Sequence, residues 1–322
     1  MPAPTLKKIA DLTGLSIRSV NRALHGNSGL SKENRKKVLR TAAQIGYTPN
    51  IAARNLRLQK NNFVGIVVPS SGLITGSGTT ITSRKINELQ LKLEHDGFFT
   101  LFGVNTDDPE DMRNLLRQWS GLVSTVIFFS WNSRWTQKEL PAQQPLQYIF
   151  VDQEADFGHC LLIDRAQGIY DGIRFLLDHG CRRLARCGNI DSRDSGFNSA
   201  LQDLTGRAIM HRHYESRNNF EDGFALGPEL IREHFDAVFF DTDRMAFGFL
   251  KYCWEHQIRI PDDIAVIGFD DEYWDMYSCP SLSTVAHPTE EMVSAISELV
   301  RNPGTAQSRQ YFKTRFIRRE SV

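Results

Sequence analysis

Arg18 and Arg22 lie four residues apart in the segment SIRSVNRALHG, in which Val20 and Leu24 mark the opposite side. If this segment is a helix, both guanidinium groups project from one face, because residues four apart are neighbours on a helix surface. A guanidinium can donate two hydrogen bonds to guanine in the major groove of DNA, and Ile17 can contact a thymine methyl group. Three short polar side chains beside them suit phosphate contacts, namely Ser16, Ser19 and Asn21. Taken singly, each of these residues also fits a solvated helix face with a capping serine.

The charges of the chain are distributed unevenly, although 38 basic and 38 acidic residues give no net charge. Residues 1–60 contain twelve lysines and arginines and only two acidic residues, so this segment carries about +10 and the remainder about −10. A compact basic segment attracts a polyanion, whereas an acidic body is repelled by it. The distribution predicts a molecule that contacts nucleic acid at one end, with a merely solvated basic surface as the alternative.

The basic segment has the pattern of three short helices. Suitable N-cap residues precede the helices, and these are Thr5, Ser16 and Ser31. Glycines that can end them are Gly14, Gly26, Gly29 and Gly46, the last in a position that favours a left-handed cap. Apolar residues recur at helical spacing, namely Leu6, Ile9, Ala10 and Leu12, then Val20, Ala23 and Leu24, then Val38, Leu39, Ala42 and Ile45. Three helices with a short turn between the first two predict a helix-turn-helix.

A hinge is expected after Tyr47. Pro49 and Asn50 can begin another short helix, IAARNLRL, which is too small to fold alone. The polar residues 59–62 follow it and suit a linker.

From Phe63 onward, short apolar runs alternate with amphipathic stretches of helical length. The runs are FVGIVV, FFTLFGV, TVIFF, QYIFV, AVFF and IAVIGF, and the stretches include ITSRKINELQLKLEHDG, RAQGIYDGIRFLLDHG and RMAFGFLKYCWEHQI. Apolar runs without strict alternation are typical of strands buried on both faces. This repetition predicts an α/β body of parallel sheets with helices on both sides, and its length favours two lobes with a cleft between them.

As a whole, the segment TLKKIADLTGLSIRSVNRALHGNSGLSKENRKKVLRTAAQIGYTPNIAARNLR resembles the amino-terminal signature of the LacI/GalR family of bacterial repressors. The resemblance implies that Ile17, Arg18 and Arg22 contact the bases. It also implies that the paired hinge helices of a dimer enter the minor groove, with Leu56 as an apolar wedge and Ala53 beside it. Such a wedge partly unstacks a base step and bends the DNA. The alternative for Leu56 is a linker leucine packed on the body.

The resemblance continues more loosely through VFFDTDRMAFGFLKYCWEHQIRIPDDIAVIGFDDEYWDMYSCPSLSTVAHPTEEM and FIRRES, which look like the family's effector domain. That domain is similar to the two-lobed periplasmic sugar-binding proteins. By resemblance, Asp270 accepts hydrogen bonds from ligand hydroxyls, Arg193 donates to them, Asp152 makes a polar contact and Phe220 forms an aromatic wall. Such a set suits a polyol. The alternatives are that Asp270 closes a strand-end turn and that Arg193 caps a helix.

Two departures from the family pattern concern the ligand. After the first strand, PSSGLITGSGTTIT replaces the aromatic pair of many relatives with glycines and hydroxyls, and such a loop before a helix can bind an anion. We therefore expect an effector with a phosphate or carboxylate near Ser71, Ser77 and Thr79. Thr242 stands where relatives commonly have asparagine, and it can still donate one hydrogen bond to the ligand.

Several classes of protein are disfavoured. No apolar stretch approaches a membrane span, and the opening residues lack a secretory signal, so a cytoplasmic protein without membrane contact is expected. The five cysteines show no CxxC spacing, which favours reduced, mostly buried thiols over disulfides or a zinc site. HExxH, GxSxG, GxGxxG and Walker-type motifs are missing, so neither catalysis nor a cofactor or metal is predicted, and a carbohydrate-processing enzyme is a distant alternative.

We therefore predict a DNA-binding transcription regulator, most simply a repressor, that is controlled by a small, carbohydrate-type effector. The expected division is residues 1–47 as the DNA-binding domain, 48–61 as the hinge and 62–322 as the body, whose lobes are about 62–162 with 288–312 and 163–287 with the last strand. The residues expected at DNA are Thr5, Leu6, Ser16, Ile17, Arg18, Ser19, Asn21, Arg22, His25, Asn50, Ala53 and Leu56. The residues expected at the effector are Ser71, Asp152, Arg193, Phe220, Thr242 and Asp270. A homodimer, and conceivably a tetramer, would bind a near-palindromic operator. The same regulator controlled by a partner protein, or by no ligand, is the alternative.

Overall fold

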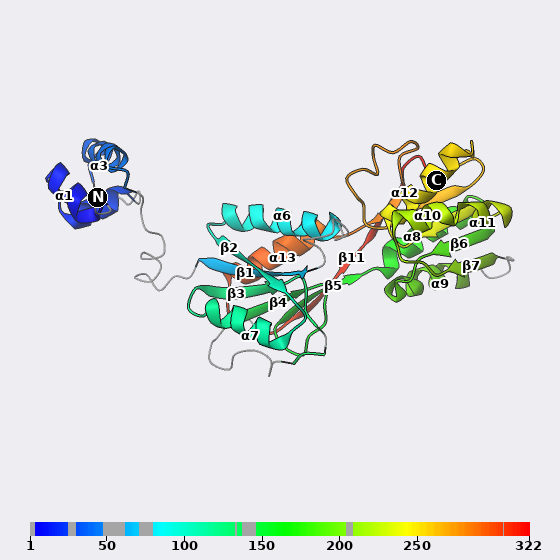
Figure 1. The fold of residues 1–322 in the computed structure, drawn as a ribbon, viewed down its shortest axis with the longest axis horizontal. Helices are drawn as coiled ribbons and strands as arrows, with labels where there is room; N and C mark the ends of the chain where they lie inside the picture. Colours follow the sequence, from blue (N-terminus) through cyan, green and yellow to red (C-terminus); the bar gives the residue numbers. More distant parts are fainter. Residues whose placement is uncertain are drawn as a thin grey trace. The chain divides into compact units, whose positions relative to one another are not determined.

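The computed structural model describes residues 4–24, 30–47, 62–70, 80–132, 134–136, 146–203, 209–304 and 306–322. The chain divides into two compact units, Met1–Asn61 and Asn62–Val322. Figure 1 shows the helices and strands of both units.

The first unit is a three-helix domain. Its helices are α1 (Leu6–Thr13), α2 (Ile17–Leu24) and α3 (Lys32–Gln44). They bury a small core that consists of Ile9, Ala10, Val20, Ala23, Val38 and Ala42. The hydroxyl of Thr5 accepts a hydrogen bond from the backbone of Lys8, and Ser31 does the same for Asn34, so both predicted N-caps are confirmed. Gly14 ends α1 at a φ of 68°, which is a conformation that favours glycine.

One expectation for this core is wrong. Leu12 was assigned to the apolar face of the first helix, but its side chain is 56% exposed. The buried face of α1 instead continues from Ala10 to Thr13, whose hydroxyl donates to the carbonyl of Ile9 at 2.7 Å. A threonine that satisfies its own hydroxyl in this way can be buried in place of an apolar residue.

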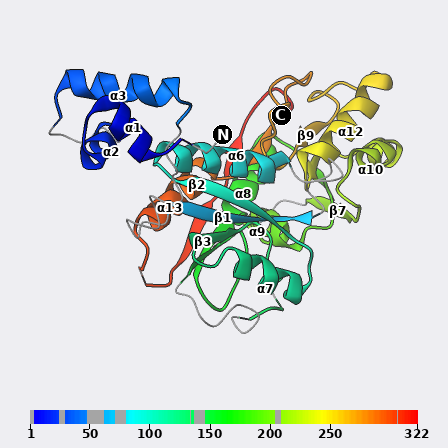
Figure 2. The same cartoon turned by 60° about the vertical axis from the view of Figure 1, so that its left-hand side comes forward.

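The second unit begins with a six-stranded parallel sheet in the order β11-β5-β4-β3-β1-β2. Its strands are β1 (Phe63–Pro69), β2 (Phe99–Asn105), β3 (Val123–Phe128), β4 (Gln147–Val151), β5 (His159–Asp164) and β11 (Arg309–Lys313). Helices α6 (Thr80–His95) and α13 (Thr289–Arg301) pack on one face, and α7 (Pro109–Gln118) packs on the other (Figure 2). We call this sheet with its three helices lobe 1.

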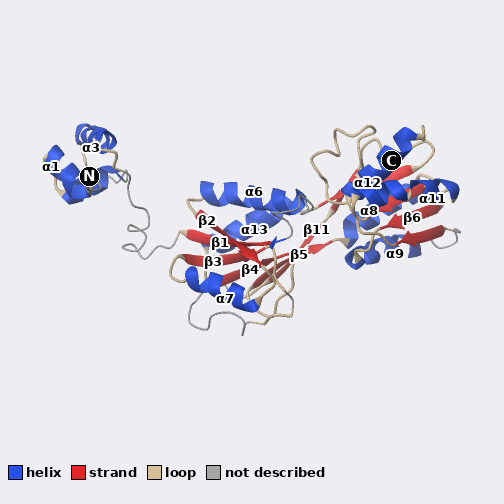
Figure 3. Cartoon of the chain, in the orientation of Figure 1, coloured by secondary structure: helices blue, strands red, loops and turns tan. Residues whose placement is uncertain are grey.

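A four-stranded parallel sheet in the order β7-β6-β8-β9 forms the second half of this unit. Its strands are β6 (Arg183–Cys187), β7 (Met210–Tyr214), β8 (Ala237–Phe240) and β9 (Ala265–Ile267). Helices α8 (Ala166–Asp178) and α9 (Asp194–Gln202) pack on one face, and α10 (Phe220–Ala225), α11 (Gly227–Arg232) and α12 (Asp243–Glu255) on the other (Figure 3). We call this sheet with its helices lobe 2.

Three chain segments connect the two lobes. They follow β5, β10 (Thr284–Ala286) and β11, and the last of them leads into β12 (Arg315–Ile317). Strands β10 and β12 pair with each other in antiparallel fashion. The α/β class with parallel sheets is confirmed, and no helix within the described residues is both long and apolar enough to cross a membrane.

Helices α10 and α12 approach each other very closely. A Cβ atom added to Gly248 on α12 would lie 1.9 Å from the carbonyl oxygen of Phe220, and one added to Gly223 on α10 would lie 1.9 Å from that of Met245. The two glycines therefore allow this helix pair to pack backbone against backbone.

Candidate nucleic-acid interface and effector site

The outer face of α2 carries the side chains that were predicted to contact DNA. Val20 and Ala23 are buried against the other two helices, which turns Arg18 and Arg22 outward, and both are exposed. Ile17 begins the helix with its side chain 50% exposed. An exposed isoleucine beside two exposed arginines suits apolar and hydrogen-bonding contacts with base edges.

The turn before α2 is held by serines. The hydroxyl of Ser16 accepts a hydrogen bond from the backbone of Ser19 at 3.1 Å and lies 2.9 Å from the hydroxyl of Ser19. Ser16 therefore caps α2, as predicted, and Asn21 is half-buried on the same helix.

The other residues predicted to contact DNA are placed differently. Thr5 is exposed at the start of α1, whereas Leu6 is half-buried and packs against the core of the three helices. His25, Asn50, Ala53 and Leu56 lie outside the described residues. Ser71, Ser77 and Thr79, which were predicted to lie near the effector, also lie outside them.

A second group of polar side chains lies at the carboxyl ends of parallel strands. Asp152 follows β4 and Arg165 follows β5, while Arg193 and Asp270 lie after β6 and β9 of lobe 2. Because parallel strands end at one edge of their sheet, this topology gathers residues that are distant in sequence. Asp152 and Arg165 form an ion pair through Oδ2 and Nη2.

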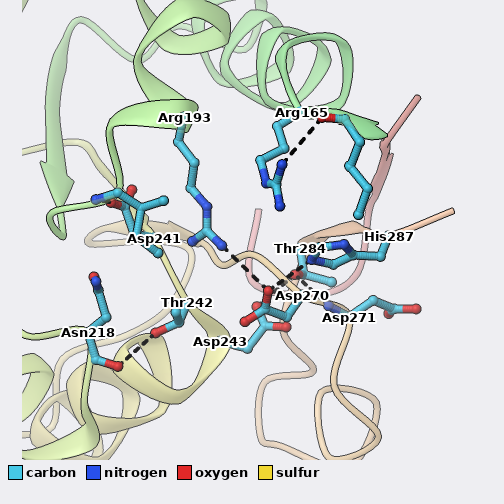
Figure 4. A network of polar contacts seen from close by, with 12 residues as sticks. Arg165, Arg193, Asn218, Asp241, Thr242, Asp243, Asp270, Asp271, Thr284 and His287 are labelled. Atoms are coloured by element: carbon cyan, nitrogen blue, oxygen red, sulfur yellow. Dashed lines mark hydrogen bonds and ion pairs between the residues drawn. The ribbon is translucent and has the colours of Figure 1, made fainter. Parts of the chain in front are cut away.

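Arg193 and Asp270 face one another (Figure 4). The Arg193 Nη2 atom lies 3.5 Å from Oδ1 of Asp270, and the Arg193 side chain is only 5% exposed. Its Cζ atom lies 3.8 Å from the centroid of the Phe269 ring. Nε and Nη1 of Arg193 have no hydrogen-bond partner within the part of the chain that the structure describes. Buried donors of this kind are costly unless a ligand or water satisfies them.

A chain of contacts continues from Asp270 to lobe 1. The Asp270 Oδ1 atom lies 3.2 Å from Nε2 of His287, and His287 Nδ1 lies 3.2 Å from Nζ of Lys85 on α6. An ammonium group can only donate, so Nδ1 accepts from Lys85 and Nε2 donates to Asp270. This arrangement specifies a neutral imidazole with its proton on Nε2.

Burial strongly affects the ionisation of this chain. It lowers the pKa of Lys85 from 10.5 to about 8, with the carboxylate of Asp152 acting in the opposite direction. Burial and then the ammonium of Lys85 lower the pKa of His287 to about 4, which agrees with the neutral imidazole. Burial also lowers the pKa of Arg193, although a guanidinium keeps its charge.

A buried ion pair positions the segment that carries Arg193. Arg186 on β6 contacts both carboxylate oxygens of Asp241, each at 3.0 Å, and donates to the carbonyl of Ile190 at 2.9 Å. Asp241 Oδ2 also accepts from the backbone of Ile190 at 2.9 Å. The pair thereby fixes the entry to the 3₁₀ turn Asp191–Arg193. Arg186 and Asp241 are positioning residues for Arg193.

Several acidic side chains lie behind Asp270. Asp243 and Asp275 are fully buried, and burial is the main cause that raises the pKa of both. Burial and the charges of Asp270 and Asp243 raise the pKa of Glu272 to about 7. Asp243 is held by the hydroxyl of Thr284 at 2.6 Å. These acidic side chains disfavour a negatively charged ligand group on their side of Asp270.

Two predicted effector residues are placed unfavourably for that role. Phe220 is not brought to the Arg193–Asp270 pair but lines a separate pocket of about 740 Å³ with α12 and the segment 272–279. The second residue, Thr242, lies beside Asn218, which comes two residues before Phe220 in the sequence (Figure 4). Thr242 donates its hydroxyl proton to the Asn218 carbonyl at 3.2 Å and accepts from Met245 at 3.3 Å as the cap of α12. In this conformation it therefore has no proton to donate to a ligand.

The structure also adds residues that sequence analysis missed. Lys85 lies on an amphipathic helix, where a lysine is ordinarily solvated, and it is 5% exposed. His287 lies just after β10 in a connection between the lobes, and only the fold brings it to Asp270. The one signal in the sequence is that Lys85 lies four residues before the buried Leu89, on the same face of α6.

Protein-family models match part of each unit. Residues 5–50 match the family model of bacterial regulatory proteins of the lacI family, and residues 173–322 match that of the periplasmic binding protein-like domain.

Curated relatives match along nearly the whole chain. The probable HTH-type transcriptional repressor ExuR of Bacillus subtilis (strain 168) is 26% identical over 343 residues, which cover 99% of this chain and 98% of the relative. The ribose operon repressor of Haemophilus influenzae is 25% identical, with the same coverage of both chains.

Solved structures share the fold. The lac repressor bound to ONPG in the repressed state has a TM-score of 0.79 at 18% identity, with 100% of both chains covered. A LacI family transcriptional regulator from Enterococcus faecium with bound ribose has a TM-score of 0.69 at 22% identity, covering 81% of this chain and 98% of that one.

Proposed function

The chain joins a helix-turn-helix domain of the lacI family of bacterial regulatory proteins to a periplasmic-binding-protein-like domain, and on this premise we propose that it is a repressor controlled by a small effector. In this proposal, α2 enters the major groove of an operator, and a carbohydrate-type ligand between the two lobes sets the affinity for that operator. The relatives are named as transcription regulators, and we propose no catalytic step.

The observation that carries the effector site is that one polar group contains residues of both lobes. Lys85 of lobe 1 reaches His287, which contacts Asp270 of lobe 2. Arg84 of α6 also donates to the carbonyl of Asp271 at 3.1 Å. A ligand that binds this group contacts both lobes and therefore favours one arrangement of the lobes over another. Its differential affinity for the two arrangements is then the free energy available to change DNA binding.

Two sets of exposed apolar side chains support a homodimer. On lobe 2, Trp254 is 76% exposed, and the segment after β9 adds Tyr273, Trp274, Met276 and Tyr277, which are also more than half exposed. On lobe 1, the exposed apolar residues on α6 and β2 are Leu91, Phe99, Phe102 and Val104. Trp254 and Trp274 of the lobe 2 set line the same pocket, and exposed apolar side chains that gather in this way mark association sites. We propose that a second copy of the chain covers the lobe 2 set, and that the dimer binds a near-palindromic operator.

The proposed roles of the chain segments follow the two units. We propose residues 1–47 for DNA contact, 48–61 for the hinge, and 62–322 for effector binding and dimerisation. We assign DNA contacts to the exposed, described residues of the predicted set, which are Thr5, Ser16, Ile17, Arg18 and Arg22. Because the proposed target is chromosomal DNA, we place the protein in the cytoplasm.

The experiment that tests the proposal combines DNA and ligand binding on the full chain. Fluorescence anisotropy measures the affinity for an operator fragment, with and without metabolites that raise the melting temperature of the protein. A ligand present at 100 times its Kd stabilises the folded protein by about 2.7 kcal/mol, which is readily detected. The proposal predicts that at least one stabilising metabolite changes operator affinity by about 5- to 150-fold. If stabilising metabolites leave operator affinity unchanged, control by a partner protein or by no ligand replaces it.

A further inference from the structure

The contacts of the proposed effector site carry information about the charge of its ligand. Lys85 and Arg193 are both about 95% buried, yet neither is fully satisfied by the described residues. Lys85 has a neutral imidazole as its hydrogen-bond partner and no carboxylate within 4 Å among the described ion pairs. Arg193 keeps two donors, Nε and Nη1, without a partner in the described structure. Buried cations with unused donors favour a negatively charged ligand group beside them.

His287 keeps Lys85 available for a ligand. Its Nδ1 atom accepts one of the three ammonium protons, while Nε2 donates to Asp270. The imidazole therefore separates the ammonium group from the nearest carboxylate of lobe 2. Without that separation, Lys85 and Asp270 would form a direct ion pair and neutralise each other. Within the described residues, the neutral histidine leaves the charge of Lys85 and two of its donors available for a ligand.

The charges around the site indicate a ligand with a single negative charge. The near set consists of three cations, Lys85, Arg165 and Arg193, and two carboxylates, Asp152 and Asp270, which act on one another electrostatically. Asp241 also acts on Arg193, but it is paired with Arg186, and Asp243 is buried behind Asp270. One monoanion would neutralise this set. A phosphate dianion would leave an excess of negative charge beside Asp270, where Asp243 and Glu272 already lie.

The two carboxylates define the rest of the ligand. Asp152 is bound to Arg165, and its side chain is 24% exposed, so it can still accept a hydrogen bond. Asp270 has a second carboxylate oxygen besides the one that contacts His287 and Arg193. Carboxylates at these places suit hydroxyl donors, as in a sugar.

We propose that the effector is a polyhydroxy carboxylate, a sugar acid whose carboxylate is held by Lys85 and Arg193 and whose hydroxyls donate to Asp152 and Asp270. This inference rests on the proposed function and names the chemical class of the ligand for that site.

The first test varies the ligand and keeps the protein intact. Isothermal titration calorimetry with the full chain compares a panel of uronic and aldonic acids with their amides, their neutral parent sugars and the matching sugar phosphates. The amide has the shape of the acid without its charge. We expect one acid to bind about 10- to 100-fold more tightly than its amide and its parent sugar, because hydrogen bonds to charged groups are the strong ones. Equal affinity of acid and amide, tightest binding by a phosphate, or no binding by any acid overturns the proposal.

The second test varies Lys85 and uses a matched control. Lys85→Met removes the ammonium group and keeps the length of the side chain, and Lys92→Met does the same at a partly exposed lysine on the same helix. The preference for the acid over its amide should fall about 10- to 100-fold in Lys85→Met and persist in Lys92→Met. A preference that survives Lys85→Met contradicts the assignment of Lys85.

Failure of this inference is distinguishable from failure of the proposed function. If a neutral sugar binds and changes operator affinity, the regulator stands and the acidic ligand falls. If an acid binds with the expected preference but never changes operator affinity, the ligand class stands and the regulatory role falls.

Discussion

Arg193 lies with its Nη2 atom 3.5 Å from Oδ1 of Asp270 and with Cζ 3.8 Å from the centre of the Phe269 ring. One side of the guanidinium is thus covered by an aromatic ring, and one nitrogen faces a carboxylate. The remaining nitrogens have no partner in the described structure, which is the arrangement of a donor that is held in place for a ligand.

Arg193→Met should weaken effector binding, so that a higher effector concentration is needed to change operator binding. The substitution keeps an apolar side chain against Phe269 but removes every donor, so we expect effector affinity to fall about 10- to 100-fold. Calorimetry with the effector measures the change. Arg232→Met, at an exposed arginine on α11, serves as the control and should bind effector as wild type does. Comparable losses in both variants would show that Arg193 has no direct contact with the ligand.

The stability of the protein should depend on Lys85 in a pH range set by its lowered pKa. The pKa is about 8 in the folded protein and 10.5 ordinarily, so between these values the unfolded chain binds more protons. The contribution of Lys85 to the free energy of unfolding therefore rises with pH over this range. Below pH 8, the charged Lys85 destabilises the folded protein by its full amount.

Lys85→Met lacks this titration. We expect its unfolding free energy in the absence of ligand to exceed that of wild type most clearly below pH 8, with the difference shrinking by up to about 3 kcal/mol by pH 10.5. Urea denaturation at a series of pH values measures the difference, and Lys92→Met supplies the baseline. A difference that stays constant with pH would mean that Lys85 is not a buried cation.

Arg22 should determine sequence preference, whereas Lys36 should contribute only charge. Arg22→Ala removes a bidentate donor from the exposed face of α2, so operator affinity should fall about 10- to 100-fold, corresponding to about 1–3 kcal/mol, while affinity for random DNA falls less. Lys36→Ala, at an exposed lysine on α3, should weaken binding to both and reduce the salt dependence. Titrations on operator and random duplexes at several salt concentrations separate the two. Equal losses on both DNAs for Arg22→Ala would remove it from base contact.

Trp254 should be needed for dimerisation. Because this side chain is 76% exposed in one chain, Trp254→Glu costs little in folding but places a charge in the proposed interface. We expect the dimer dissociation constant to rise about 10-fold or more, with weaker operator binding, since tryptophan is enriched among the residues that dominate interface energies.

Leu122→Glu is the matched control for Trp254→Glu. Leu122 is 49% exposed on lobe 1, and it lies outside both exposed apolar sets. Light scattering across a concentration series should give the wild-type dimer for this control. A dimer of unchanged strength in Trp254→Glu would place the interface elsewhere.

Local sequence patterns predicted the elements that stabilise themselves locally. The three helices of the first unit have serine and threonine caps, and glycines follow the ends of α1 and α3, and both signals act within one helical turn. The apolar strands β1, β3, β4, β8 and β9 were identifiable because they are buried on both faces. The edge strand β2 was identifiable by its apolar composition, although much of it is exposed.

Strands with polar composition were not predicted. β6 has the sequence RLARC and β7 the sequence MHRHY, and neither resembles a buried strand. Arg186 lies in the core of lobe 2, where it pairs with Asp241, 55 residues away, and with Asp194. Sequence patterns within a window of ten residues cannot reveal a partner as distant as Asp241.

The residues of the effector site were also predicted only in part. Arg193 and Asp270 were inferred from family likeness, and the structure brings them together. Lys85 and His287, 202 residues apart, could not be found in this way because their contact depends on how lobe 1 packs against the connection after β10. Phe220 was also assigned by family likeness, but it lines the pocket formed with α12 and the segment 272–279.

Selection from a large pool of random duplexes, at modest salt, with the purified full-length chain tests the central claim most directly. The account predicts enrichment of one near-palindromic sequence, and a change in its affinity when the effector is added. If no sequence is enriched over the starting pool, with or without cell metabolites, the protein is not the effector-controlled, sequence-specific regulator described above.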